Sequence, residues 1–324
     1  MATEPIIEIT LNENEWREAQ AAQAVRSLQE SPPTLDPVWF YDKVGSDLFD
    51  EITRLPEYYL TRAERSLLLA HADEIAALGA TALVELGSGT SDKTRVLLDA
   101  MTAQGSLQTY VPIDVSEQTL RDAAASIALE YPTLAVHGIV ADFHSCFERL
   151  PSSDRRLVAF IGSTIGNLDP AQRSRFLFDL DCALAREDRL LLGVDLVKDP
   201  DRLLAAYNDS AGVTAELNRN ALRVLNAELG SDFDAEQFVH RAIWNDEERR
   251  IEMRSQAETD QSVKLPGVDH PLMFAAGSEL RTEISSKFTV EGMTEELWTR
   301  NFEVDTVWVS EGNEFALFLA HPYC

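Results

Sequence analysis

The stretch TALVELGSGTSDKTRVLLDA, residues 81–100, decides the fold. A short apolar run ends in a glycine-rich turn, and the turn leads into apolar residues at helical spacing, as expected for a buried parallel strand followed by a helix. Further strand-like segments occupy residues 109–115, 134–143, 155–168 and 188–199, and helical segments occupy 91–104 and 117–131. Strands that alternate with helices in this way predict an α/β fold with a doubly wound parallel sheet.

The pattern changes after Lys198, where the segments become helical or mixed, including residues 234–253. Strand-like segments return at 285–290 and 304–322, and the turn SEGNE makes the second of these a hairpin. We interpret the chain as a seven-stranded sheet interrupted by an insertion. We predict that residues 62–196 and 287–324 form the sheet domain and that residues 1–61 and 197–286 form a second, mixed domain.

The N-terminal part of that second domain has fewer signals. An amphipathic helix is expected from about Trp16 to Val25, followed by a break at Ser31-Pro32-Pro33. A turn is expected at Gly45, because glycine commonly interrupts regular structure.

Composition excludes several classes of function. The 324 residues include 28 Lys+Arg and 55 Asp+Glu, a net charge of −27, which disfavours nucleic acid as a partner because phosphate binding needs a basic face. Three scattered cysteines favour reduced thiols over disulfides or a metal site. No apolar run approaches the roughly 20 residues that span a bilayer, and the acidic N-terminus is unlike a signal peptide. We therefore expect a cytoplasmic protein with no membrane partner.

Three motifs at predicted strand ends suit a nucleoside ligand. Gly87 and Gly89 allow close backbone approach, but Asp92 stands where a dinucleotide fingerprint needs a third glycine, so a ligand without a pyrophosphate fits better. Asp114 ends the next strand, where a carboxylate can accept hydrogen bonds from both ribose hydroxyls. Asp142-Phe143 follows the third strand, where the pair can contact the amine and face of an adenine. Taken singly, the first motif is also compatible with a plain turn and Asp114 with a helix cap.

Together the three motifs resemble a class I S-adenosylmethionine-dependent methyltransferase. The resemblance implies a seven-stranded Rossmann-like sheet with a second, mixed substrate-binding domain, and S-adenosyl-L-methionine as cofactor without a metal. Lys93 lies one turn into the first helix, where it either pairs with the methionyl carboxylate or is a solvated lysine.

A second resemblance is more specific. The segment GSTIGNL, residues 162–168, follows the fourth strand and resembles the corresponding loop of the L-histidine Nα-methyltransferase family, the first enzyme of ergothioneine biosynthesis. The resemblance extends through WFYDKVGSDLFDEITRLPEYYLTRAE, VELGSGTSDKTR, LLLGVDLVKD, AYNDSAGVTAELNRNALRVLNAEL and WNDEERRIEM.

This resemblance implies a set of site residues. Asn167 and Tyr207 would hold the amino-acid backbone of the substrate, and Tyr41 and Tyr58 would line the same pocket, with Asn167 and Tyr41 serving the reaction itself. The remaining implied contacts are Glu283 and Ser285 to the imidazole, Met253 beside it, and Gly87, Lys93, Asp114, Asp142 and Phe143 to the cofactor. Spacing i, i+2 on an extended segment would point Glu283 and Ser285 to one face.

The implied activity is threefold methylation of the α-amine of free L-histidine, which gives hercynine. Methylation of another acceptor, such as tryptophan or a protein N-terminus, and a non-catalytic sensor of the same fold are the alternatives. None of the six histidines falls in a motif segment, so the proton of the amine goes to solvent or to a pocket tyrosine. We expect a monomer.

Overall fold

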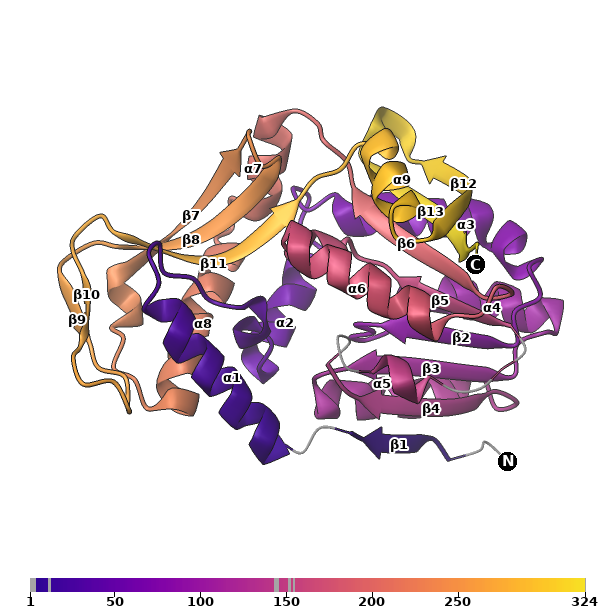
Figure 1. The fold of residues 1–324 in the computed structure, drawn as a ribbon, viewed down its shortest axis with the longest axis horizontal. Coiled ribbons are helices and arrows are strands. Elements are labelled where there is room, and N and C mark those ends of the chain that lie inside the picture. Colours follow the sequence, from indigo (N-terminus) through magenta and orange to yellow (C-terminus); the bar gives the residue numbers. More distant parts are fainter. Residues whose placement is uncertain (1–3, 11–12, 143–145, 151–152, 154, 324) are drawn as a thin grey trace. The chain divides into compact units, whose positions relative to one another are not determined.

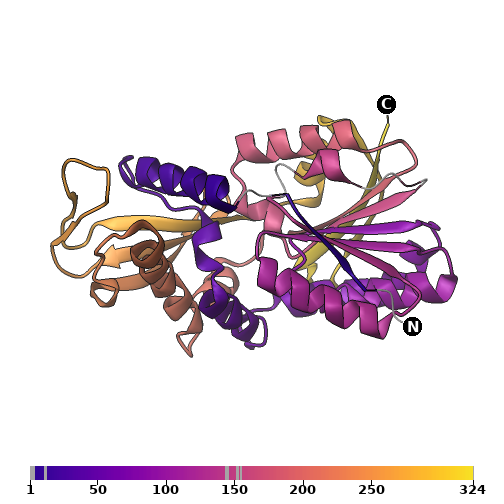
Figure 2. The same cartoon turned by 90° about the horizontal axis from the view of Figure 1, so that it is seen from below.

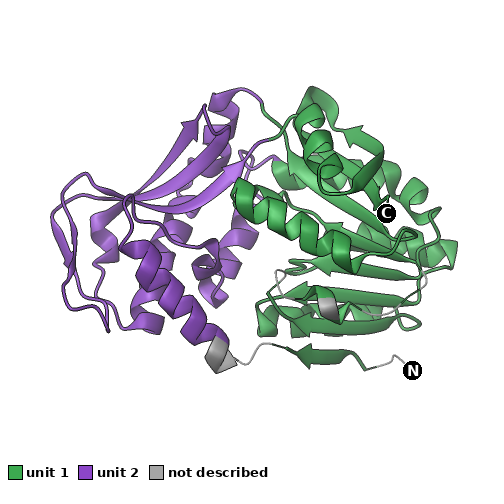
Figure 3. Cartoon of the chain, viewed as in Figure 1, with its two compact units in different colours: residues 1–11, 60–197, 288–324 green, residues 12–59, 198–287 purple. Residues whose placement is uncertain are grey.

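The computed structural model describes residues 4–10, 13–142, 146–150, 153 and 155–323. The chain forms two compact units (Figure 3), of which unit 1 contains residues 1–11, 60–197 and 288–324, and unit 2 contains residues 12–59 and 198–287. The prediction placed the whole of residues 1–61 in the second domain. Residues 1–11 instead belong to unit 1, because Ile6–Ile9 forms a strand of its sheet.

Unit 1 is built on an eight-stranded sheet with the strand order β1-β4-β3-β2-β5-β6-β13-β12 (Figure 1). Its strands are β1 (Ile6–Ile9), β2 (Ala82–Leu86), β3 (Thr109–Asp114), β4 (Ala135–Val140), β5 (Arg156–Phe160), β6 (Arg189–Asp195), β12 (Phe302–Val309) and β13 (Phe315–Pro322). The first six in this order are parallel, and β13 pairs antiparallel with both β6 and β12. The predicted doubly wound α/β fold is confirmed, but the sheet has one strand more than the seven predicted.

Helices cover both faces of this sheet (Figure 2). The helices of unit 1 are α3 (Leu60–Ala76), α4 (Arg95–Gln104), α5 (Glu117–Glu130), α6 (Pro170–Ala183) and α9 (Val290–Trp298). Leu83 belongs to the core formed with α3, α4 and α5, whereas its neighbour Val84 belongs to the core formed with α6 and α9. Successive residues of a strand point to opposite faces, so burial on both faces explains the uninterrupted apolar run of β2.

The order of connections predicts a ligand-binding position at the carboxyl ends of the central strands. From β2 the chain proceeds outward through β3 and β4, and then returns to place β5 on the other side of β2. Loops after the carboxyl ends of β2 and β5 therefore diverge, and in open α/β sheets ligands bind at such a switch point.

Unit 2 combines helices with antiparallel strands. Its elements are α1 (Glu13–Leu28), α2 (Lys43–Ile52), α7 (Pro200–Tyr207), α8 (Val213–Leu229), a sheet β11-β8-β7 and a β9–β10 hairpin. The strands are β7 (Phe238–Asn245), β8 (Arg250–Ala257), β9 (Gln261–Val263), β10 (Leu272–Phe274) and β11 (Glu279–Ser286). The described part of the chain also contains short 3-10 helices, namely η1 (Pro37–Phe40), η2 (Phe147–Arg149), η3 (Thr164–Asn167), η4 (Ala235–Gln237) and η5 (Glu311–Asn313). Residues 234–253, predicted as helical or mixed, contain η4, β7 and the first half of β8.

The prediction of a turn at Gly45 is wrong, because this residue lies in the first helical turn of α2. The Asp42 side chain caps this helix by accepting a hydrogen bond from the Gly45 N–H at 2.7 Å. A Cβ at Gly45 would lie 1.6 Å from the Phe40 carbonyl oxygen, so the close approach of the preceding backbone requires glycine. Asn220 of α8 also donates to Asp42, at 2.8 Å, and joins the two segments that make up unit 2.

Among the described residues, no helix is both long enough and apolar enough to cross a membrane.

Candidate active site

The glycine loop after β2 is open where a ligand would approach. Gly87 and Gly89 have φ angles of 69° and 50°, and a Cβ added to either would meet no atom within 4 Å. The Gly89 N–H donates to Asp114 Oδ2 at 2.8 Å, and the Ser116 N–H donates to Asp114 Oδ1 at 2.9 Å. Burial raises the pKa of Asp114, although these two backbone hydrogen bonds act in the opposite direction. The carboxylate at the end of β3 therefore fixes the loop that follows β2.

A buried carboxyl group supports the same loop from β2. Glu85 accepts hydrogen bonds from the hydroxyl groups of Thr94 and Tyr110, and Tyr110 lies 2.8 Å from the hydroxyl of Ser91. Burial raises the pKa of Glu85 to about 7, against the lowering effect of the two hydroxyl donors and of Lys93. Ser91 has a φ of 56°, a left-handed conformation that is unfavourable for a non-glycine residue and persists because the surrounding contacts hold it.

Lys93 is held by a residue that the sequence analysis missed. Its ammonium group pairs with the carboxylate of Glu64, which is completely buried and also accepts a hydrogen bond from the Gly162 N–H at 2.7 Å. Glu64 thereby connects α3 with the loops after β2 and β5. Lys93 is therefore not a solvated lysine, the alternative that the sequence left open. Glu64 ends the motif LPEYYLTRAE, but its neighbours in sequence gave no sign of this ion pair.

The third predicted cofactor position lies on the neighbouring strand. Asp142 follows β4 by two residues, so Gly87, Asp114 and Asp142 occur after β2, β3 and β4, which are adjacent in the sheet. Burial and the nearby Asp142 carboxylate raise the pKa of the Cys146 thiol to about 12, so this cysteine is not a nucleophile near neutral pH. Phe143 lies outside the described residues.

Asn167 is the one predicted substrate residue that belongs to unit 1. It ends η3, which follows β5 through Gly162 and Ser163, both with left-handed φ angles, 84° and 59°. The Ser163 hydroxyl accepts a hydrogen bond from the Asp195 N–H at 2.9 Å, so the neighbouring strand β6 fixes this turn. Asn167 is partly exposed.

The other predicted substrate residues belong to unit 2, where β11 presents two of them. Glu283 lies directly opposite the buried Met253 of β8, and opposite residues in antiparallel strands share a face. Burial raises the pKa of Glu283 to about 7, whereas the Lys287 ammonium lowers it. The side chain keeps limited contact with solvent, and no described residue donates a hydrogen bond to its carboxylate. Glu283 thus offers two acceptor oxygens in a half-buried position.

Ser285 is part of a buried three-residue cluster, which we call the Lys287 cluster and which comprises Tyr207, Ser285 and Lys287. The hydroxyl groups of Tyr207 and Ser285 are 2.7 Å apart, and Lys287 Nζ lies 2.9 Å from the first and 2.8 Å from the second. The same ammonium lies 4.5 Å from the centre of the Tyr207 ring. The sequence analysis missed Lys287, although Glu283, Ser285 and Lys287 are spaced by two, the period of an extended strand.

Aromatic side chains connect the predicted tyrosines. Tyr41, Phe49, Tyr58 and Tyr207 form a row of edge-to-face contacts with ring centres 5.9, 6.2 and 6.3 Å apart. Edge-to-face packing fixes ring positions, because the positive edge of one ring meets the negative face of the next. The structure therefore brings all three predicted tyrosines together, and Phe49, which sequence reasoning missed, joins two of them.

Comparison with known proteins assigns the family. Residues 20–322 match the model of a family described as histidine-specific methyltransferase, SAM-dependent. The chain belongs to this family. It is 50% identical to the histidine N-alpha-methyltransferase of Mycolicibacterium smegmatis over 93% of this chain and 95% of that protein. The corresponding protein of Mycobacterium tuberculosis is 48% identical, over 90% of this chain and 92% of its own length. Ergothioneine biosynthesis protein 1 of Neurospora crassa is 29% identical, over 90% of this chain and 33% of that protein.

This membership confirms the predicted enzyme class and cofactor: the protein is an S-adenosylmethionine-dependent methyltransferase. The residues of unit 1 fit that cofactor. The open backbone at Gly87 and Gly89 leaves room for a ligand, and the buried hydroxyl of Ser88 between them has no hydrogen-bond partner among the described residues. When bound, the cofactor supplies an electrophilic methyl group on a sulfonium. Among the described residues, no group of three or more His, Cys, Asp and Glu side chains is arranged to hold a metal ion.

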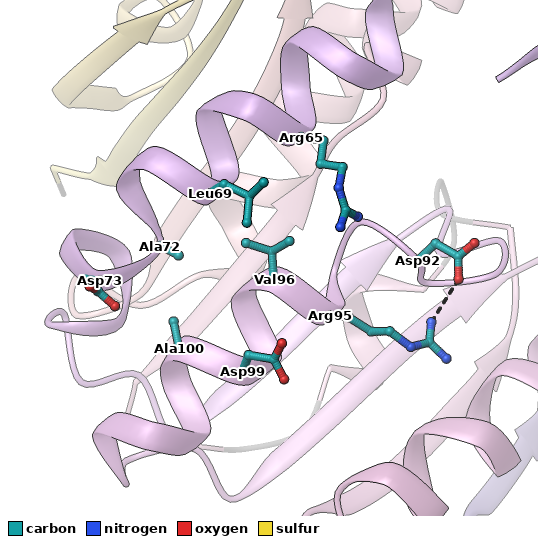
Figure 4. Close-up of a pocket in the computed structure, with 9 residues that line it drawn as sticks. All are labelled: Arg65, Leu69, Ala72, Asp73, Asp92, Arg95, Val96, Asp99 and Ala100. Carbon is teal, nitrogen blue, oxygen red and sulfur yellow. Dashed lines mark hydrogen bonds and ion pairs between the residues drawn. The ribbon is translucent and has the colours of Figure 1, made fainter. Parts of the chain in front are cut away.

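A hollow elsewhere on unit 1 does not belong to this site. It has a volume of about 700 Å³ and lies between α3 and α4, with Arg95 paired to Asp92 at 3.1 Å on its border (Figure 4). None of the predicted cofactor or substrate residues lines it.

Proposed function

We propose that this methyltransferase transfers methyl groups from S-adenosylmethionine to the α-amino group of free L-histidine, three times, to give hercynine for ergothioneine biosynthesis. The observation that carries the proposal is the pairing of Glu283 with Ser285 on β11, in a chain of the histidine-specific family. The names of the mycobacterial and fungal relatives support the same substrate and pathway.

The pair on β11 matches the chemistry of an imidazole. A neutral imidazole has one N–H donor and one nitrogen lone pair. Glu283 has a carboxylate without a hydrogen-bond donor from the described residues, and it would accept from the ring N–H. Ser285 would donate its hydroxyl to the other nitrogen, and Met253 would pack against the ring. A site with such polar groups rejects analogues that leave them unpaired.

The remaining side chains are assigned to the amino-acid backbone and to the reaction. Asn167 and Tyr207 would bind the backbone of the substrate, and Tyr58 would line the same pocket. Asn167 and Tyr41 would also orient the reacting amine. Transfer requires a neutral amine whose lone pair is aligned with the methyl group, so the main contribution of the enzyme is alignment. Each of the first two methylations leaves an ammonium that must lose a proton before the next, to solvent or to a pocket tyrosine.

In unit 1, four described residues would hold the cofactor. Asp114 would accept hydrogen bonds from the ribose hydroxyls, Lys93 would bind the methionyl carboxylate while keeping its ion pair with Glu64, and Asp142 would accept from the adenine amine. Gly87 would allow close approach of the backbone. Phe143 is proposed to contact the adenine face.

The alternative acceptor is another amino acid such as tryptophan. An indole has a ring N–H that would satisfy Glu283, but it has no acceptor nitrogen for Ser285. The chemistry of the pair therefore favours histidine. We further propose that the enzyme works as a monomer in the cytoplasm, without a nucleic acid or membrane partner.

Incubation of the purified enzyme with histidine and S-adenosylmethionine tests the proposal. Mass spectrometry should detect the addition of one, two and finally three methyl groups, with fragmentation that places all three on the α-nitrogen. Turnover beyond one equivalent per enzyme excludes a sensor. Absence of any mass gain on histidine would contradict the proposal.

A further inference from the structure

The Lys287 cluster has a donor arrangement that restricts what Ser285 can do. A lysine ammonium only donates hydrogen bonds, whereas a hydroxyl group has one proton and two acceptor positions. Lys287 Nζ donates to Ser285 Oγ at 2.8 Å and to Tyr207 at 2.9 Å, and the two hydroxyl groups share a further hydrogen bond at 2.7 Å. Both Lys287 and Ser285 are buried, so these contacts are not exchanged with bulk water.

The direction of the bond between the two hydroxyl groups follows from their acidity. A phenol, with a pKa near 10, is a better hydrogen-bond donor and a poorer acceptor than an aliphatic hydroxyl group. We therefore assign the Tyr207 hydroxyl as the donor and Ser285 Oγ as the acceptor of this bond. Ser285 Oγ then accepts from both Lys287 and Tyr207, which fills its two acceptor positions and leaves its proton for a third partner.

We propose that Lys287 is a specificity-determining positioning residue, because it makes Ser285 an obligatory hydrogen-bond donor toward the substrate ring. The inference rests on the proposed function and refines it. A ring placed between Glu283 and Ser285 must then offer both a donor and an acceptor. Neutral imidazole has both, whereas indole and pyrrole have only the donor and imidazolium has two donors.

Lys287 can hold Ser285 in this state because its ammonium group has no acceptor atom. A glutamine or serine in its place would accept as well as donate, and Ser285 would regain an acceptor position by rotating its proton. The contact of the ammonium with the Tyr207 ring, 4.5 Å from its centre, holds the cation on the cluster. Lys287 follows Ser285 by two residues, as Ser285 follows Glu283, so the ammonium group lies close to the hydroxyl group whose proton it directs.

The test compares histidine with the two pyrrolylalanines in which one ring nitrogen is replaced by C–H, so that the N–H remains and the acceptor is lost. The quantity measured is the ratio of kcat/KM for histidine to kcat/KM for the analogue. Lys287→Met keeps the length and apolar stem of the side chain and removes its donors. We expect the ratio to fall by roughly tenfold or more in this variant, because Ser285 no longer presents an unmatched proton to the analogue.

Lys198 offers a matched control in the same unit. Its ammonium donates to the Tyr59 hydroxyl at 2.7 Å and lies 4.5 Å from the Tyr59 ring centre, a geometry like that of Lys287 on Tyr207. Lys198→Met should leave the specificity ratio within about twofold of the wild type. An equal fall of the ratio in both variants would indicate general loosening of unit 2 and would overturn the inference.

Two further variants keep the inference testable where Lys287→Met does not fold. Tyr207→Phe removes the other donor to Ser285 and should lower the ratio in the same direction. In a Ser285→Ala background, where no hydroxyl remains to be oriented, Lys287→Met should leave the ratio unchanged. A wild-type enzyme that does not methylate histidine contradicts the proposed function, whereas an active wild type with the same ratio as folded Lys287→Met contradicts the role of Lys287 alone.

Discussion

The candidate sites of the two units are built in different ways. In unit 1 the proposed cofactor site combines an open backbone loop, at Gly87 and Gly89, with Asp114 at a strand end that fixes this loop. In unit 2 the proposed substrate site consists of side chains on one antiparallel strand, Glu283 and Ser285, and the Lys287 cluster supports Ser285.

This difference separates what the enzyme shares with many methyltransferases from what selects its substrate. A backbone loop at the switch point of a parallel sheet can bind the same ligand in many proteins, provided that a few side chains such as Asp114 fix it. Two polar side chains in a half-buried position accept only a ring with matching donors and acceptors. Changes in unit 2 should therefore alter the choice of substrate, and changes in unit 1 should alter cofactor affinity.

The largest expected effect comes from Glu283→Ala. Loss of the carboxylate leaves a ring N–H unpaired in a half-buried position, so the dissociation constant for histidine should rise by roughly a hundredfold. Cofactor affinity, measured by calorimetry on the same sample, should stay within about twofold. Glu279→Ala provides the control, because this glutamate lies on the same strand and pairs with Arg254. Equal weakening of histidine and cofactor binding would indicate a folding defect and would contradict the assignment of substrate binding to unit 2 and cofactor binding to unit 1.

Asp114→Ala should produce the converse result. The variant lacks the charged carboxylate that would accept hydrogen bonds from the ribose. The dissociation constant for the cofactor should therefore rise by about tenfold to a hundredfold. The matched control is Asp92→Ala, in the loop after β2 that Asp114 fixes; the Asp92 side chain is 71% exposed and pairs with Arg95. Cofactor binding that is unchanged by calorimetry in Asp114→Ala would refute the ribose assignment.

The pH dependence of histidine binding sharpens the role of Glu283. Its pKa of about 7 means that the carboxylate, the form that accepts from the ring N–H, increases as pH rises from 6 to 8. Histidine affinity should therefore rise over this range by about tenfold more in the wild type than in Glu283→Gln, where only the substrate titrates. Parallel pH profiles for the two proteins would show that Glu283 does not contact the ring.

The smallest expected effect concerns stability. The pKa of Glu283 is raised on folding, from 4.5 to about 7, so the folded state binds its proton more tightly than the unfolded state. The resulting stabilisation is fully present below pH 4.5 and is lost as pH rises through 7. The Tm of Glu283→Gln minus the Tm of the wild type should therefore be a few degrees larger at pH 8 than at pH 5. A constant difference in Tm between the two proteins at both pH values would contradict this account of the buried carboxyl group.

The cofactor side of the molecule was largely predictable from sequence. Alternation of apolar strands and helices from residue 81 onward gave the doubly wound sheet, because strands buried on both faces have an unmistakable apolar run. The strand β1 was missed because it has only four residues and none of them is buried. Glu64 was missed because its partners Lys93 and Gly162 come from distant parts of the sequence.

The substrate side was predictable only by resemblance. Most residues of β7 are half-buried, so its sequence lacks the clean polar–apolar alternation of a strand with one buried face. Glu283 would otherwise pass for a surface carboxylate, since its raised pKa depends on burial that local sequence does not encode. The spacing of Glu283, Ser285 and Lys287 was visible, but only the hydrogen bonds to Tyr207 give Lys287 a role.

Competition between amino acids is the most direct test of the claim that free L-histidine is the methyl acceptor. The purified enzyme would receive S-adenosylmethionine and an equimolar mixture of the twenty common amino acids, and the methylated products would be identified by mass spectrometry. The account predicts that histidine gains three methyl groups while tryptophan and the others remain unmodified. Methylation of tryptophan or another amino acid in preference to histidine would contradict it.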